Sequence, residues 1–219
     1  MSTERIYGRR PVEEAERGRR AVHRVWRAPE TSPEELEQLC GSPEHQGVVA
    51  EVDPYPYVEP GSLFEDDDGV GLVVVVDQIQ DPQNLGAICR SAEVAGAAGV
   101  VIAERRAAAI TPAACKASAG AVEHLPVARV RNIADWLKQA KQADAWIYGA
   151  AAEAARRYTE VDWVGRAVLV MGSEGSGLRT RVASTCDELV SIPVKGRVGS
   201  LNASVAAAVI LFEAVRQRD

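Results

Sequence analysis

The chain has 219 residues, enough for one large domain or for a compact domain with a small appendage. Hydrophobic residues make up 47% of it and aromatic residues only 5%, which is typical of an α/β protein packed through small side chains. The net charge of -6 argues against a protein that coats nucleic acid. No apolar run reaches the roughly 18 residues of a membrane span, and the N-terminus does not have the pattern of a secretory signal. We therefore expect a cytoplasmic protein.

Residues 1–52 are predicted to form a small separate α+β module. A proline in the first turn favours a helix over residues 11–19, and residues 21–28 (AVHRVWRA) have the composition of a strand. A second helix is expected at residues 32–39 and a second strand at residues 46–52. The module is short for an independent core.

Arginine is concentrated in this module. Because arginine binds phosphate oxygens through paired hydrogen bonds, the cluster favours an RNA-facing surface. A solvated surface, in which the arginines pair with neighbouring glutamates, is the alternative. The candidates for RNA contacts are Arg9, Arg10, Arg19 and Arg20.

Residues 53–71 have the composition of a linker. The segment contains three prolines and three glycines, and it carries an acidic run at residues 65–68. The predicted boundaries are therefore 1–52 for the module, 53–71 for the linker and 72–219 for the main domain.

From residue 72 onward, apolar strands alternate with helical stretches, which predicts a mainly parallel sheet with helices on both faces. Strands are expected near residues 72–77, 99–103, 125–129, 145–150, 167–171 and 188–192. Helices are expected near residues 84–96, 111–119, 132–142, 177–184 and 201–216. The last helix is apolar almost all round, so it should be buried on most faces.

Three of the expected strands lead into loops rich in glycine and polar residues. Residues 81–90 (DPQNLGAICR) follow the first strand, and Asn84 is positioned to cap the next helix. Residues 168–178 (VLVMGSEGSGL) and 189–204 (LVSIPVKGRVGSLNAS) have the same character, with Ser200 as the expected N-cap of the last helix. One such loop occurs in many nucleotide-binding folds, but three in one domain are specific.

These three segments, in this order, resemble the three motifs of the SpoU branch of the SPOUT RNA methyltransferases, over about residues 72–218. They are most like bacterial enzymes that methylate a guanosine 2'-hydroxyl in 23S ribosomal RNA. The resemblance implies S-adenosylmethionine as the cofactor, RNA as the substrate, a C-terminal trefoil knot and a homodimer packed through the last helix. The family's N-terminal domain resembles an RNA-binding ribosomal-protein fold, which is shortened here between Ala28 and Gln46. Transfer RNA is the second candidate substrate.

The resemblance also implies which residues bind the cofactor. Glycine turns let backbone atoms approach a ligand closely, because no Cβ intervenes. The matching positions are Met171, Gly172, Ile192, Val194, Gly196, Ser200 and Leu201. Lys195 and Arg197 lie in the third segment, beside the turn that opens the last helix, and could either contact RNA phosphates or be solvated.

The implied catalytic residues are Asn84, Arg90, Glu174 and Asn202. Glu174 is expected to organise the site, and Asn202 to orient the ribose hydroxyl. In the family the matching arginine is held to be catalytic, in one version as the base. Because a guanidinium stays protonated in proteins, we expect Arg90 instead to anchor the target phosphate and ribose. Arg90 of one subunit could do this in the cofactor site of the other subunit. The alternatives are a surface or ion-paired structural arginine for Arg90 and a solvent-facing loop residue for Glu174.

The cysteines and histidines do not indicate further chemistry. The four cysteines are far apart and the three histidines are scattered, so neither a zinc site nor a redox motif is indicated, and no metal is expected. We expect buried, reduced thiols.

Two other classes remain open: a non-catalytic RNA-binding protein that keeps the cofactor fold, and a small-molecule enzyme, whose commonest phosphate-binding motifs are absent.

Overall fold

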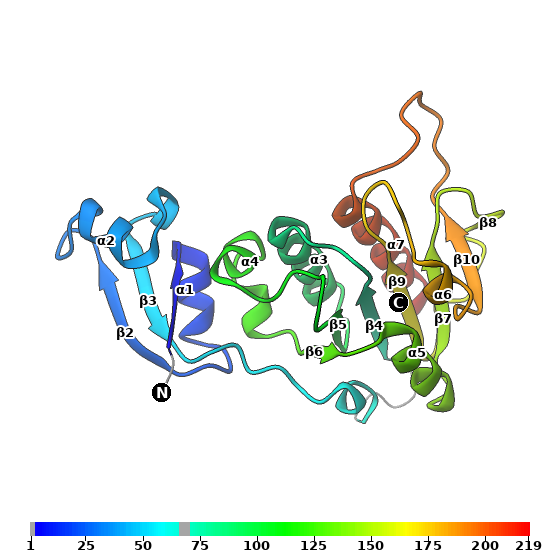
Figure 1. Ribbon diagram of the computed structural model, residues 1–219, viewed down its shortest axis with the longest axis horizontal. Helices are drawn as coiled ribbons and strands as arrows, with labels where there is room; N and C mark the ends of the chain where they lie inside the picture. Colours follow the sequence, from blue (N-terminus) through cyan, green and yellow to red (C-terminus); the bar gives the residue numbers. More distant parts are fainter. Residues whose placement is uncertain (1–2, 66–70) are drawn as a thin grey trace.

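The computed structural model describes residues 3–65 and 71–219. A small N-terminal module with a three-stranded sheet lies beside a larger domain built on a seven-stranded sheet (Figure 1). Of the acidic run expected at residues 65–68, only Glu65 falls within the described residues. None of the described helices is long and apolar enough to cross a membrane.

The N-terminal module is an antiparallel sheet with the strand order β1-β3-β2. Its elements are β1 (Glu4–Tyr7), α1 (Arg9–Ala15), β2 (Val22–Arg27), α2 (Pro33–Cys40), the 3-10 turn η1 (Pro43–His45) and β3 (Val48–Val52). α2 begins as expected, because Ser32 and Glu35 form a capping box. α1 ends earlier than expected, since the chain turns at Gly18, where a Cβ would lie 2.7 Å from the Cβ of Glu123.

The main domain contains a sheet in which every pair of neighbouring strands is parallel. The strand order is β6-β5-β4-β9-β7-β10-β8. The strands are β4 (Leu72–Val76), β5 (Gly99–Ala103), β6 (Val127–Val130), β7 (Trp146–Ala150), β8 (Arg156–Arg157), β9 (Ala167–Met171) and β10 (Glu188–Ser191). The helices are η2 (Pro60–Phe64), α3 (Pro82–Val94), α4 (Pro112–Ala117), η3 (Ala121–Glu123), α5 (Ile133–Gln142), α6 (Thr180–Ala183) and α7 (Ala203–Arg218). The six expected strands are confirmed, and the two-residue β8 was not predicted.

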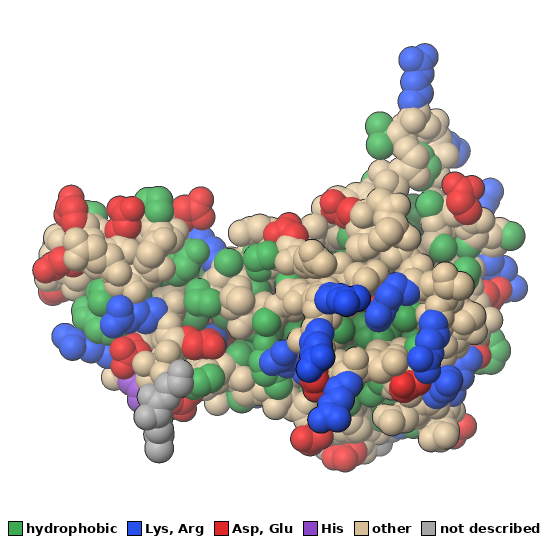
Figure 2. All heavy atoms as spheres, in the orientation of Figure 1, with side chains coloured by type: hydrophobic (Ala, Val, Ile, Leu, Met, Phe, Trp, Pro, Cys, Tyr) green, Lys and Arg blue, Asp and Glu red, His purple; other side chains and the backbone are tan. Residues whose placement is uncertain are grey.

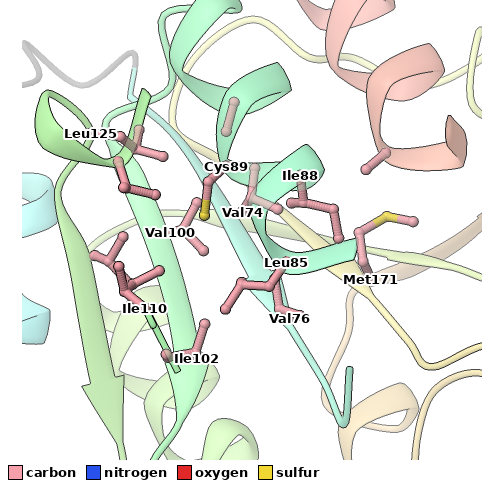
Figure 3. Packing of buried hydrophobic residues seen from close by; sticks show 14 of the residues in the cluster. Val74, Val76, Leu85, Ile88, Cys89, Val100, Ile102, Ile110, Leu125 and Met171 are labelled. Carbon is pink, nitrogen blue, oxygen red and sulfur yellow. The ribbon is translucent and has the colours of Figure 1, made fainter. Parts of the chain in front are cut away.

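Helices cover both faces of this sheet, as expected. Alternate residues of β4 belong to different hydrophobic clusters: Val74 and Val76 pack with α3 and α7, whereas Val73 and Val75 pack with α5 and α6. Figure 3 shows the first cluster, in which the side chains of α3 point toward β4 and β5. Because both faces of the sheet are buried, the sequence of β4 is a continuous apolar run and does not alternate between apolar and polar residues.

A buried ion pair joins the module to the main domain. The guanidinium of Arg20 donates to both carboxylate oxygens of Glu123 at 2.9 and 2.5 Å, and neither side chain has any exposed area. The hydroxyl of Tyr55 lies 3.0 and 2.9 Å from the carbonyl oxygens of Val122 and Leu125. The segment with linker composition is therefore packed against the main domain at its beginning.

The prediction that Arg20 contacts RNA is wrong. Its side chain is enclosed between the module and the main domain, where it also donates to Glu4 at 3.2 Å. The arginine cluster gave no sign of this role, because Glu123 lies 103 residues further along the chain. Arg19 remains exposed but donates to the hydroxyl of Tyr55 and to the carbonyl of Leu125.

Two helix starts differ from the expectation. α3 is capped by Asp81 and not by Asn84, and α7 is capped by Asn202 and not by Ser200. In both cases the capping residue has a non-helical conformation, and its side-chain oxygen accepts from a backbone N–H of the first turn. Asn84 therefore lies inside α3, where its amide is available for other contacts. The trefoil knot stays a prediction.

The four cysteines are free thiols. Cys89 and Cys115 are buried, and burial raises the pKa of both thiols to about 12, so neither is a nucleophile at neutral pH. Cys40 and Cys186 are half-buried. The expectation of buried thiols is therefore confirmed for two of the four.

Candidate active site

Three side chains predicted for the site meet at the carboxyl edge of the sheet. Asn84 lies in α3 after β4, Glu174 on the loop after β9, and Asn202 directly before α7. The Asn84 amide donates to Oε1 of Glu174 at 3.2 Å, and the Asn202 amide donates to Oδ1 of Asn84 at 2.9 Å and also to Oε1 of Glu174. These segments meet because β4 and β9 are neighbouring parallel strands, whose carboxyl ends lie at the same edge.

The cluster is held at the N-terminus of α7. The backbone nitrogen of Ala203 lies 3.4 Å from Oε1 of Glu174, and the positive end of a 16-residue helix favours a carboxylate there. The side-chain oxygen of Asn202 accepts from two backbone N–H groups of α7, which fixes the amide nitrogen toward Glu174 and Asn84. The cluster therefore presents one carboxylate and two oriented amides, groups that can hydrogen-bond a substrate hydroxyl.

The loop after β9 is a tight turn beside this cluster. Ser173 and Gly177 exchange two backbone hydrogen bonds of 3.2 and 3.0 Å. Gly175 and Gly177 have φ angles of 84° and 64°, which glycine adopts without steric cost. A Cβ on Gly172 would lie 2.5 Å from the backbone nitrogen of Leu178, so this position admits no side chain.

Asp77 fixes the far end of the same loop and was not predicted. It is fully buried at the end of β4, and its carboxylate accepts from the backbone N–H of Arg179 at 3.1 Å and from the Arg179 guanidinium at 2.8 and 2.6 Å. A carboxylate that directly follows a buried strand needs a partner, and this was the signal in the sequence. The loop from Gly172 to Arg179 is thus anchored at both ends.

Gly172→Ala should disturb cofactor binding more than folding. Because the atoms that its Cβ would meet are backbone atoms of the turn, the loop must shift, and we expect cofactor affinity to fall about tenfold or more. Isothermal titration calorimetry with S-adenosylmethionine measures this. The matched control is Gly61→Ala, where a Cβ meets nothing within 4 Å. Equal affinities in the two variants would contradict a cofactor site at this loop.

A cavity of about 450 Å³ opens between the loops that follow β7, β9 and β10. Apolar side chains and glycine backbone line much of it, which suits a nucleoside-sized ligand. The predicted positions that line it are Met171, Gly172, Ile192, Val194, Ser200 and Leu201, and Gly196 is not among them. The residues from Ala150 to Glu153 also line the cavity and were not predicted. Their position after the parallel strand β7 was the signal that could have identified them.

Arg90 lies outside the three-residue cluster. It is six residues from Asn84, which corresponds to about 9 Å along the axis of α3 and about 120° around it. Its side chain is exposed, and within the described residues it has no hydrogen-bond or ion-pair partner. Arg90 therefore has a guanidinium that is available for an external anion or for a second copy of the chain.

The other predicted RNA-binding residues lie on two surfaces. Arg9 and Arg10 are exposed on α1, and Arg10 pairs with Glu13 at 3.5 Å. Lys195 and Arg197 lie on the exposed loop between β10 and α7, which projects from the main domain (Figure 1). Within residues 3–65 and 71–219, no group of three His, Cys, Asp or Glu side chains could hold a metal ion.

The parallel sheet covered on both faces, with a nucleoside-sized cavity at its carboxyl edge, defines an α/β protein of the class that binds nucleoside cofactors. Residues 71–212 match the SpoU rRNA Methylase family, and residues 29–58 match the RNA 2'-O ribose methyltransferase substrate binding family. The chain therefore belongs to the SpoU rRNA Methylase family.

Relatives and solved structures agree with this assignment. A Bacillus subtilis protein described as a TrmH family tRNA/rRNA methyltransferase is 42% identical over 80% of this chain and 72% of its own length. A Synechocystis protein described as a tRNA/rRNA methyltransferase is 44% identical over 84% of this chain, which spans only 48% of that relative. The crystal structure of the SpoU methyltransferase AviRb from Streptomyces viridochromogenes, in complex with the cofactor AdoMet, is 28% identical and superposes with a TM-score of 0.84, covering 98% of this chain and 89% of AviRb.

Proposed function

We propose that the protein transfers a methyl group from S-adenosylmethionine to a ribose 2'-hydroxyl in RNA. The contact of Asn84, Glu174 and Asn202 beside the cavity carries this proposal, because three separate motifs converge on one polar cluster. The family, the AdoMet complex of AviRb and the match to a substrate-binding family support it.

The cavity fits the cofactor in size and in chemistry. Ile192, Leu201 and Met171 would supply apolar surface for an adenine ring, and the backbone beside Gly172 would offer hydrogen-bonding groups at close approach. When bound, S-adenosylmethionine supplies an electrophilic methyl group on a sulfonium. The protein's contribution is to align the nucleophile with it, and such positioning supplies much of the acceleration in two-substrate reactions.

The polar cluster would hold the ribose hydroxyl. The amides of Asn84 and Asn202 are oriented by Glu174 and by the cap of α7, so they can position the hydroxyl without reorganising. Arg90 would bind the neighbouring phosphate, since arginine pairs with phosphate through two parallel hydrogen bonds.

A guanosine of 23S ribosomal RNA is the favoured target, and transfer RNA is the alternative. The relatives above are described with both kinds of RNA, so the choice needs a direct test. Ribosomal and transfer RNA from a strain lacking the protein would be incubated separately with enzyme and labelled cofactor. We expect label in the large-subunit RNA; label in transfer RNA alone would overturn this target. The expected location is that of the RNA substrate, the cytoplasm.

A homodimer through α3 and α7 is the proposed assembly. Val205 and Phe212 on α7 are 48% and 49% exposed, and Val94 on the adjacent α3 is 63% exposed. α7 is thus less buried than its composition indicated, and its outer face offers apolar surface for a second copy. Arg90 shares the exposed side of α3 with Val94, which favours its action in the partner's site.

Phe212→Glu should separate the dimer. A charge placed in the apolar interface must be desolvated, so the variant should elute as one chain of 23.5 kDa, whereas the unmodified protein should have twice that mass. Size-exclusion chromatography with light scattering measures both. Trp146→Glu is the control, because Trp146 is an apolar residue that is 53% exposed at the start of β7 and belongs to neither α3 nor α7. A monomeric unmodified protein would overturn the assembly.

A further inference from the structure

Three arginines that no motif singled out lie after β5 and β6. Arg105 and Arg106 lie two and three residues after the end of β5, and Arg131 directly follows β6. Arg105 and Arg106 are exposed and have no hydrogen-bond or ion-pair partner among the described residues, and the side chain of Arg131 is 92% exposed. We call Arg105, Arg106 and Arg131 the basic edge.

The basic edge lies on the same edge of the sheet as the proposed active site. Because all strands are parallel, the residues that follow β5 and β6 lie beside those that follow β4 and β9. β6 is three strands from β9, about 14 Å at the usual spacing between strands. β5 and β6 are also the strands nearest to the N-terminal module (Figure 1). The basic edge therefore lies between the cofactor cavity and the module.

The charge of this region contrasts with that of the whole chain. The net charge is -6, yet Figure 2 shows Lys and Arg side chains gathered on the face of the main domain over β4, β5, α5 and α6. Glu104 is the acidic side chain nearest to Arg131, at 4.0 Å, and it does not neutralise three guanidinium groups. Arg106 has a φ of 58°, a conformation that is uncommon outside glycine.

We propose that the basic edge binds backbone phosphates of the RNA strand that leads from the target ribose toward the N-terminal module. Arginine suits this role because its planar guanidinium pairs with phosphate through two hydrogen bonds. The proposal rests on the proposed function and adds the path of the substrate. It also explains how an acidic protein presents a basic surface where RNA must approach.

The double variant Arg105→Ala/Arg106→Ala tests this path, with Arg156→Ala/Arg157→Ala as a matched control. The control removes an adjacent pair of exposed arginines from β8, the strand at the opposite end of the sheet. RNA affinity is measured by filter binding at several salt concentrations, and KM and kcat are measured with the same RNA. For the test variant, we expect KM for RNA to rise roughly tenfold at unchanged kcat. The slope of log affinity against log salt concentration should become shallower by about 1.4, which is about 0.7 for each lost phosphate contact.

Each outcome separates this proposal from the proposed function. Unchanged KM and salt slope in the test variant, with normal methyl transfer by the unmodified protein, would overturn the basic edge alone. An equal loss in both variants would overturn it as well, because the effect would then be one of general charge. RNA binding that depends on Arg105 and Arg106, without any methyl transfer by the unmodified protein, would support the basic edge and overturn the proposed function.

Discussion

Arg20→Ala should lower the free energy of unfolding by about 3–5 kcal/mol, the usual cost of leaving a buried charge without its partner. The variant leaves the carboxylate of Glu123 without its partner between the module and the main domain, where neither side chain of the pair is exposed. Burial opposes the charged form of Arg20, but the hydrogen bond with Glu123 and the charge of Glu123 outweigh it and raise the pKa of Arg20 above its ordinary value. Urea unfolding at neutral pH measures the loss.

Two further variants make the Arg20 test specific. Arg10→Ala removes an arginine that is 72% exposed in its side chain, so it should change stability by less than about 0.5 kcal/mol. Arg20→Met/Glu123→Leu removes both charges and should recover most of the stability, because a buried ion pair is often replaceable by apolar side chains. If Arg20→Ala unfolds like the unmodified protein, the two parts of the chain are not joined by this ion pair.

Arg90→Ala should reduce methyl transfer about 100-fold or more while S-adenosylmethionine binding is retained. The guanidinium is expected to bind the substrate phosphate, and loss of one aligned electrostatic group in an active site has effects of this size. Arg90 does not line the cofactor cavity, so calorimetry should give an unchanged cofactor affinity. Single-turnover transfer to RNA measures the chemical step. Undiminished transfer would contradict the assignment.

Mixing two inactive variants tests whether Arg90 acts across the dimer. In a dimer of one Arg90→Ala chain and one Glu174→Gln chain, one site regains both groups only if Arg90 serves the partner's site. We therefore expect the mixture to recover part of the activity that each variant lacks. If Arg90 serves its own site, the mixture stays inactive.

The strands could be predicted because local sequence determines them, whereas the polar cluster was identified through the resemblance to the SpoU motifs. β4 is a run of five apolar residues, and the motif loops contain their functional residues within a few positions of a strand end. The resemblance singled out Asn84, Glu174 and Asn202 in these loops, and the structure brings the three side chains into contact.

Features that depend on distant partners could not be predicted. The burial of Arg20 depends on Glu123, and the anchoring of Asp77 depends on Arg179, more than 100 residues away in each case. The choice of Asn202 as the cap of α7 depends on the path of the preceding loop, which does not follow from propensity.

The central claim is that the site transfers a methyl group to a ribose oxygen of RNA. The most direct measurement is mass spectrometry of nucleosides from RNA that was incubated with the protein and S-adenosylmethionine carrying a labelled methyl group. We predict the label on the ribose, as 2'-O-methylguanosine, and its absence with Asn202→Ala. Label on a base, or no label although the cofactor binds, would contradict the claim.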